Sequence, residues 1–407
     1  MNLDSDVRFD RVCVMSVPQV GCPSITTSIC PPAPATHAYM VSVTPQVSSM
    51  LDAGAVVAIG VSGGKDSVAC ALRIDAYLNT IGHTGSRVLI HADLGSVEWK
   101  DSLPVCERLS KQIGWELVVV KRRAGGMMER WETRWANNLA RYQALECVKV
   151  ILPWSTPSMR FCTSELKSAV IASELSRRFK GQHILSVTGV RHDESAARAK
   201  MPIAKVNAKL SKKNVVGLDW NAIIDWPTAA VFDYISEQSG PLHEAYTTYG
   251  SSRVSCSFCI MGSIGDMHAS VSCSDNHAIY RRMVDLEVQS TFGLQGSRWL
   301  GDLSPALLDD GTRAALERAK KAQKVREAAE ARIPKHLLFC KGWPDAVPSY
   351  EEAALLGEVR QVVSRVLGIP ATFIQPDEIM ARYAELIAER SLKQRLKVKT
   401  RKTTYEK

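Results

Sequence analysis

The stretch AIGVSGGKDSVACALRI, at residues 58–74, decides the fold. It contains the end of a continuous apolar run, VVAIGV at 56–61, which is typical of a strand that is covered on both faces of a sheet. Two glycines, a lysine, an aspartate and a serine follow, and residues 67–80 then have the spacing of an amphipathic helix. Because a glycine-rich turn at the start of a helix exposes successive backbone N–H groups, this stretch predicts an anion-binding site.

Strand and helix patterns alternate on both sides of this stretch. The alternation predicts an α/β fold, a Rossmann-like and mostly parallel sheet with helices on both faces. Ligands of such sheets bind at the carboxyl ends of the strands, which is where the glycine-rich turn lies. The other strand patterns are at 87–93, 115–121, 183–190 and 222–226, and the other helical patterns are at 47–54, 99–114, 163–179 and 227–238.

Composition divides the chain into four parts. Residues 1–40 mix proline, serine and threonine without a helix or strand period, so we expect this N-terminal segment to be disordered. Residues 41–275 carry the α/β pattern, residues 276–390 form an α-helical C-terminal region, and residues 391–407 form a basic tail.

The charge of the chain is unevenly distributed. Of the net charge of +9, the tail SLKQRLKVKTRKTTYEK carries +6, since it has seven Lys or Arg and one Glu. A solvated tail without a specific partner and a tether to nucleic-acid phosphates both account for this charge. The chain has no apolar run of about 18 residues and no secretory signal at its start, so we expect a cytoplasmic protein without membrane contact.

The glycine-rich turn is not a Walker A loop. Gly60 is one residue too close to the Gly64–Lys65 pair, and Asp66 stands where that motif needs Ser or Thr. The strand, the SGGKDS turn and the helix together resemble the PP-loop of the ATP pyrophosphatase superfamily. The resemblance implies an adenine nucleotide alpha hydrolase-like fold that binds ATP with Mg²⁺ and cleaves between the α and β phosphates. The implied phosphate-binding residues are Ser62, Gly63, Gly64, Lys65, Asp66 and Ser67.

Three further segments resemble the phosphoadenosine phosphosulfate (PAPS) reductase family. They are HADLGSVEW at 91–99, GVRHDESAARAKMP at 189–202, and the run from IIDWP to SCSFCIMG at 223–262. The first segment is similar to a D-T-G-like segment beside the nucleotide, of which Asp93, Gly95 and Glu98 are retained. The resemblance implies that ATP, PAPS or adenylylsulfate is the ligand. It also implies a catalytic role for Lys65, Asp66 and Arg191, and nucleotide contacts from Asp93, Gly189, Arg191 and Arg198.

Four of the eleven cysteines are candidate metal ligands. Cys256 and Cys259 form a C-x-x-C pair, whose two thiolates reach one metal from one turn, and Cys162 and Cys273 are the candidates to complete the set. This part resembles the iron–sulfur adenylylsulfate reductases and the sulfurtransferase subunit of DNA phosphorothioation systems, which implies a 4Fe–4S cluster. A structural zinc and buried thiols without metal are the alternatives. The other cysteines show no ligand spacing: Cys13, Cys22, Cys30, Cys70, Cys106, Cys147 and Cys340.

These features predict an enzyme that uses an adenine nucleotide. The first hypothesis is a nucleotidyl or sulfur transferase that adenylylates an acceptor, releases pyrophosphate and takes sulfur from a donor protein. The second is a sulfonucleotide reductase that releases sulfite. Such a reductase needs a late nucleophilic cysteine, and only Cys340 is available, in a context, LLFCKGWP, that differs from the family's E-C-G-[IL]-H motif. The third is a non-catalytic nucleotide-binding subunit of a modification or defence complex.

Overall fold

The computed structural model describes residues 39–405 except residue 341. The expected disorder of residues 1–40 therefore lies almost wholly outside the described residues. At residues 39 and 40 the chain is packed, because the ring of Tyr39 lies 5.3 Å from that of Trp226, and Trp226 Nε1 donates to Met40 O.

Six strands form one sheet, in the order β3-β2-β1-β4-β6-β5. All neighbouring pairs are parallel except β5 and β6, which are antiparallel. The mostly parallel α/β sheet predicted from the sequence is thus confirmed. The strands are β1 (Val56–Gly60), β2 (Arg87–Asp93), β3 (Glu116–Lys121), β4 (Ile184–Val187), β5 (Ala204–Val206) and β6 (Gly217–Trp220).

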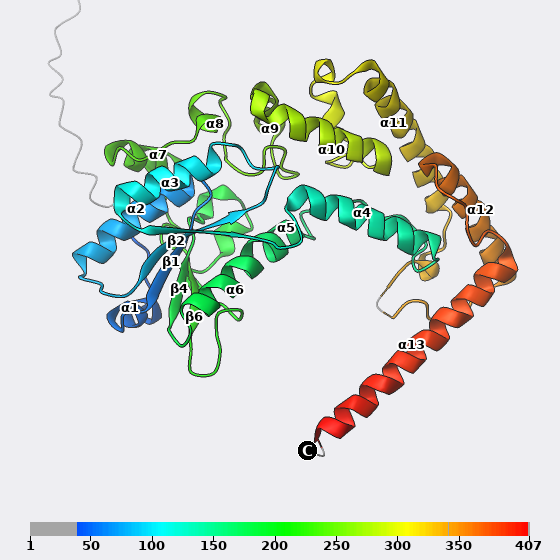
Figure 1. Cartoon of the computed structure of the whole chain (residues 1–407), viewed down its shortest axis with the longest axis horizontal. Helices are drawn as coiled ribbons and strands as arrows, with labels where there is room; N and C mark the ends of the chain where they lie inside the picture. Colours follow the sequence, from blue (N-terminus) through cyan, green and yellow to red (C-terminus); the bar gives the residue numbers. More distant parts are fainter. Residues whose placement is uncertain (1–38, 341, 406–407) are drawn as a thin grey trace, which may run out of the picture. The chain divides into compact units, whose positions relative to one another are not determined.

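Helices cover both faces of this sheet (Figure 1). Alternate residues of β1 point to opposite faces, so Val57 and Ile59 belong to one apolar cluster and Val56 and Ala58 to another. The first cluster also contains residues of α1 (Pro45–Asp52), α2 (Lys65–Thr80), α3 (Ser102–Ile113) and α7 (Thr228–Glu237). The second contains residues of α6 (Ala169–Arg178), which follows the short α5 (Phe161–Thr163) and a π-helical turn at Ser164–Ser168.

One expectation about this layer is wrong, and two of its strands were not expected. The predicted strand at 222–226 is wrong, because this apolar segment forms a turn that buries Ala222, Ile223 and Ile224 after β6 has ended. Strands β5 and β6 were not predicted. They have only three and four residues, which is too short a stretch to show the alternating pattern of a strand.

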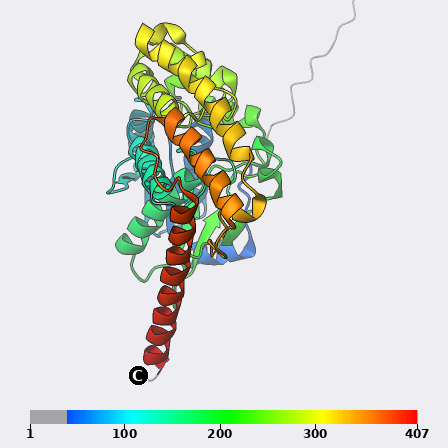
Figure 2. The same ribbon diagram turned by 90° about the vertical axis from the view of Figure 1, so that its right-hand side faces the viewer.

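The C-terminal helices share a separate apolar core. This cluster unites Trp131 and Trp135 with Tyr280, Leu316 and Val363. Figure 2 shows the last long helices, which are α10 (His277–Ser290), α11 (Asp310–Ala331), α12 (Tyr350–Leu367) and α13 (Pro376–Tyr405), and each of them contacts the next. Helix α4 (Met127–Gln143) ends more than 130 residues before the predicted boundary at 275, yet it packs with these C-terminal helices. The remaining helices are α8 (Glu244–Thr247) and α9 (Ile264–Ser272).

The predicted basic tail continues helix α13, whose backbone is helical to Tyr405. The side chains from residue 393 onward lie outside the described residues, so its predicted contact with nucleic acid stays a prediction. Within the described part of the chain, none of the helices is both long and apolar enough to cross a bilayer.

Candidate active site

The glycine-rich turn joins β1 to α2 at the carboxyl edge of the sheet. Gly63 has φ of +74°, and a Cβ at this position would lie 2.8 Å from Ser102 O, so both its conformation and its surroundings require glycine. Ser67 Oγ donates to Gly64 O at 2.8 Å and accepts from Ser62 N at 3.3 Å. These bonds fix the turn around the start of α2, where Gly64 is the N-cap and no side chain caps the helix.

Lys65 is held in place at the first position of α2, and only 5% of it is exposed. Its Nζ donates to Ser252 O at 3.2 Å and lies 3.4 Å from Asp66 Oδ2. The same ammonium lies 5.3 Å from the ring centroid of Tyr246 and 5.6 Å from that of Phe232. A partly desolvated cation with few alternative positions is the kind of group that binds a phosphate strongly.

A cavity of about 600 Å³ opens over this turn. Its lining includes Ser62, Gly64 and Ser67, and it extends to residues 252–255, just before the C-x-x-C pair. Positive charge exceeds negative charge in the lining, which favours an anionic ligand. The cationic side chains are Lys65, Arg160, Lys167, Arg191, Arg198 and Arg253, and the carboxylates are Asp66, Glu98, Asp193 and Glu194.

Gly189 and Arg191 lie where β4 ends, against the first turn of α2. A Cβ at Gly189 would lie 2.3 Å from Asp66 O, so only glycine lets the two backbones approach this closely. Arg191 is 2% exposed, and its Nε donates to Asp66 Oδ1 at 2.7 Å, while its Nη1 donates to Trp226 O at 3.0 Å. The observed bonds of Arg191 thus position Asp66, and its predicted contact with phosphate stays a prediction.

Arg198 faces two other arginines across the cavity. Burial and the positive charges of Arg253 and Arg160 lower the pKa of Arg198, and its guanidinium forms an ion pair with Glu194. Arg160 and Arg253 are exposed and make no ion pair with any described residue. Three guanidinium groups that repel one another, of which two have no ion-pair partner among the described residues, favour a multiply charged anion between them.

Glu98 connects the cavity to a buried histidine that sequence reasoning missed. His91 Nε2 lies 3.2 Å from Glu98 Oε2, and His91 Nδ1 lies 3.0 Å from Val61 O, directly before the glycine turn. Burial by itself would lower the pKa of His91, but hydrogen bonds to Cys106 and Glu98 outweigh burial and raise the pKa to about 10. A protonated His91 donates both bonds and fixes the position of the Glu98 carboxylate at the cavity wall.

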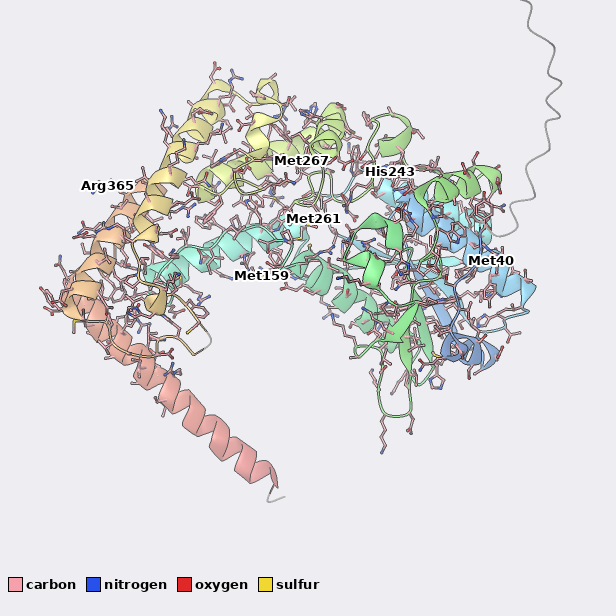
Figure 3. All side chains as sticks on the ribbon, turned by 180° about the vertical axis from the view of Figure 1, so that it is seen from behind. Met40, Met159, His243, Met261, Met267 and Arg365 are labelled. Atoms are coloured by element: carbon pink, nitrogen blue, oxygen red, sulfur yellow. The ribbon has the colours of Figure 1, made fainter. Side chains whose placement is uncertain are left out.

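His243, which Figure 3 labels, is a second buried histidine missed by sequence reasoning. Its Nδ1 accepts from Ala245 N at 3.0 Å, and its Nε2 lies 3.3 Å from Ser102 Oγ. Burial lowers the pKa of His243 to about 4, so the ring is neutral and Nε2 carries the proton. His243 is the N-cap of α8, and its other partner, Ser102, is the first residue of α3 and lies 141 residues earlier in the chain, so the local sequence does not predict this contact.

Asp93 caps its own turn. Its Oδ1 accepts from Gly95 N at 2.7 Å, and Gly95 adopts the left-handed conformation with φ of +78°. This bond is within the turn itself, so the predicted contact of Asp93 with the nucleotide stays a prediction.

Three of the predicted cysteine ligands influence one another. The pKa of Cys256 is raised because the thiol is buried and because Cys259 and Cys162 would repel a thiolate there. The backbone of the C-x-x-C segment is hydrogen-bonded to the segment after β2. Glu98 and Cys256 form an antiparallel backbone bridge, and Ser257 N donates to Val97 O at 2.8 Å. The three thiols thus gather beside the wall of the cavity that Glu98 forms.

This donor set fits an iron–sulfur group in its chemistry. Thiolates are the ligands that iron–sulfur clusters take, and a cationic iron group would relieve the repulsion that raises the pKa of Cys256. Among the described residues, no three His, Cys, Asp or Glu side chains are arranged to hold a single metal ion. Cys273, the fourth candidate, is buried beside Trp99 and Ala245, and its thiol is hydrogen-bonded to Tyr249.

Comparison with known proteins places the chain in a family. Residues 56–272, a little over half of the chain, match the phosphoadenosine phosphosulfate reductase domain. A solved structure that is similar is the U34-tRNA thiolase NcsA from Methanococcus maripaludis with its 4Fe–4S cluster, at 16% sequence identity and a TM-score of 0.33. That similarity covers 60% of this chain and 75% of the thiolase chain, and no curated protein matches. On the match over residues 56–272, the chain belongs to the phosphoadenosine phosphosulfate reductase domain family.

Proposed function

We propose that this protein binds ATP in the cavity over the glycine turn and transfers its adenylyl group to an acceptor oxygen. The observation that carries this proposal is the buried Lys65 at the start of α2, which faces a cavity that arginines line on other sides. In the reaction the acceptor oxygen bonds to the α-phosphorus, the bond from that phosphorus to the α–β bridging oxygen breaks, and pyrophosphate leaves. Fixed positive charge stabilises the charge that builds up on the leaving group.

Different residues of the cavity bind the phosphates and the Mg²⁺ ion. The backbone N–H groups of the glycine turn and Lys65 Nζ bind the phosphates that become pyrophosphate. Arg198 binds the opposite side of the triphosphate. Asp66, fixed by Arg191, would hold Mg²⁺ together with the phosphates, since Mg²⁺ prefers oxygen ligands and keeps several waters.

The cysteines account for the second step of the proposed reaction, the transfer of sulfur. Cys162, Cys256 and Cys259 would hold an iron–sulfur cluster, which when bound supplies a place to carry sulfur beside the cavity. Hydrosulfide supplied by a donor protein then bonds to the acceptor atom that carries the activated oxygen, the bond from that atom to the oxygen breaks, and AMP leaves with the oxygen. Glu98, which lines the cavity and pairs with Cys256, lies between the two parts of the site.

The family match favours a second candidate, a sulfonucleotide reductase that releases sulfite. This reaction needs Cys340 as a nucleophile. Cys340 is exposed, and its thiol donates to Asp345 Oδ2 at 3.7 Å in the connection before α12. It lies outside the matched residues 56–272.

Titration calorimetry with MgATP tests the proposal on Lys65→Met, which keeps the length of the side chain between Tyr246 and Phe232 but removes its charge. We expect ATP affinity to fall at least about tenfold, whereas the exposed Lys111→Met should bind as the wild type does. Unchanged ATP binding and turnover in Lys65→Met would overturn the proposal. ATP binding without pyrophosphate release in the presence of acceptor would indicate a nucleotide-binding subunit. Thioredoxin-dependent sulfite release that is lost in Cys340→Ala would indicate the reductase.

A further inference from the structure

A basic groove lies beside the cavity, on a surface that the proposed ATP reaction does not use. We define the basic groove as the depression of about 630 Å³ that Arg130, Arg134, Arg160 and Lys209 line, with Glu165 as the carboxylate in its lining. Its floor includes Phe161, whose ring lies 4.7 Å from the guanidinium carbon of Arg130. The groove therefore combines several cations with one acid.

The groove is continuous with the cavity and with a further depression. Arg160 lines both the basic groove and the cavity over the glycine turn. Lys209 lines both the basic groove and an adjoining depression of about 520 Å³, which Arg177 and Lys212 also line. Three adjoining hollows thus carry a row of cations that ends at the phosphate-binding turn.

Several of these cations have no internal acid to neutralise them. Arg130 is paired with Glu165 through bonds of 2.8 and 3.1 Å, and Arg177 is paired with Glu174 through bonds of 2.9 and 2.6 Å. Arg160 and Lys212 make no ion pair with any described residue, and the bond of Lys209 Nζ is a long one, to Ser164 O at 3.4 Å. Surface cations without an acidic partner gain most from a ligand with several phosphates in a row, because each contact releases counterions from that ligand.

The groove also offers surfaces for bases. Met159, which Figure 3 labels, lines the groove and is 42% exposed. Arg134, whose Nε donates to Leu152 O at 3.0 Å, holds its guanidinium 5.2 Å from the centre of the Phe161 ring. Fixed guanidinium planes and apolar side chains beside cations are the features on which unpaired bases stack.

We propose that the basic groove binds a single-stranded segment of nucleic acid and that this strand presents the acceptor atom to the cavity. The inference rests on the proposed function, because it names the acceptor of that reaction. A small anion would fill one hollow, whereas a strand fills the whole row. The strand must be unpaired at the acceptor, because a base in an intact duplex cannot enter a cavity of about 600 Å³.

Fluorescence anisotropy with labelled single strands of about 12 nucleotides, one of RNA and one of DNA, tests this proposal without ATP. The test variant is Lys209→Gln/Lys212→Gln. The control is Lys321→Gln/Lys324→Gln, which removes the same charge from exposed positions of α11. We expect the test variant to bind either strand about tenfold more weakly than the control, and its slope of log affinity against log salt to be smaller by about 1.4.

Equal affinities in the two variants would overturn the proposal, since binding would then follow net charge alone. A duplex that competes as well as the single strand would also overturn it. Failure of the proposed function is read separately, because Lys65→Met is tested with ATP and the groove variants are tested with oligonucleotide alone.

Discussion

Arg191 Nε donates to Asp66 Oδ1 at 2.7 Å, which ties the end of β4 to the first turn of α2. Arg191 is 2% exposed, and Asp66 also lies 3.4 Å from Lys65 Nζ. The carboxylate is therefore held between two cations at the glycine turn. This arrangement favours a positioning role for Arg191, which orients Asp66.

Replacing Arg191 should therefore damage both stability and binding. We expect Arg191→Met to lower the free energy of unfolding by about 3 kcal/mol, because it removes the nearer of the two cations beside Asp66 and also the donor to Trp226 O. ATP affinity should fall as well, since Asp66 is no longer fixed. Urea denaturation and calorimetry measure the two effects. In the matched Arg253→Met, which removes an exposed arginine of the same cavity, stability should stay within about 0.5 kcal/mol of the wild type.

The close approach at Gly189 makes a second prediction. A Cβ here would lie 2.3 Å from Asp66 O and 3.0 Å from Ser67 N, so Gly189→Ala must push β4 away from the glycine turn. We expect a loss of about 1–3 kcal/mol in unfolding free energy and weaker ATP binding. Gly265→Ala is the control, because its nearest neighbour is at 3.8 Å and alanine suits helix α9. Equal stabilities of the two variants would contradict this account.

His243 makes the stability depend on pH. Its pKa is about 4 in the folded protein, against an ordinary value of 6.5, because burial disfavours the charged ring. Between these pH values the unfolded state binds more protons, so stability falls as the pH drops from 6.5 to 4, by about 3 kcal/mol from this residue. In His243→Asn, whose amide oxygen can still accept from Ala245 N, that part of the pH dependence should disappear. Denaturation curves at several pH values measure the difference, and parallel curves for the two proteins would argue against it.

The cysteines predict a pattern of iron retention. After anaerobic purification we expect bound iron and acid-labile sulfide in the wild type, and their loss in Cys162→Ala, Cys256→Ala and Cys259→Ala. Cys273→Ala should keep its iron, because the Cys273 thiol is hydrogen-bonded to Tyr249 and lies in an apolar cluster that does not contain the other three cysteines. A colourless wild-type protein would remove the cluster from the proposed function. Loss of iron in Cys273→Ala would make Cys273 the fourth ligand.

Local patterns predicted the parts of the fold whose physics is local. The apolar run of β1 and the helical period of α2 are visible within a short window, because burial on both faces and the helix period each repeat within it. Helix α4 was not predicted, although its apolar residues have helical spacing. Its partners in the apolar core include helices more than 130 residues further along the chain.

The site shows the same division. The phosphate binding that we propose for the glycine turn was predicted from its own residues, since backbone N–H groups at a helix start and a lysine are the features that bind an anion. Arg160 and Arg253 were not assigned to the site from the sequence, because each lies in an irregular segment whose neighbours in space cannot be recognised from local spacing. Only their convergence on one cavity gives them a role.

The sequence by itself determined the alternating α/β order, the glycine turn at the end of the first strand and the spacing of the C-x-x-C pair. Each of these depends on residues that are close in the chain. The tertiary structure alone decided that Arg191 bonds to Asp66 across 125 residues and that Glu98 lies between the cavity and Cys256. Such contacts depend on how β1, β2 and β4 are placed side by side in the sheet, and no short stretch of sequence specifies that placement.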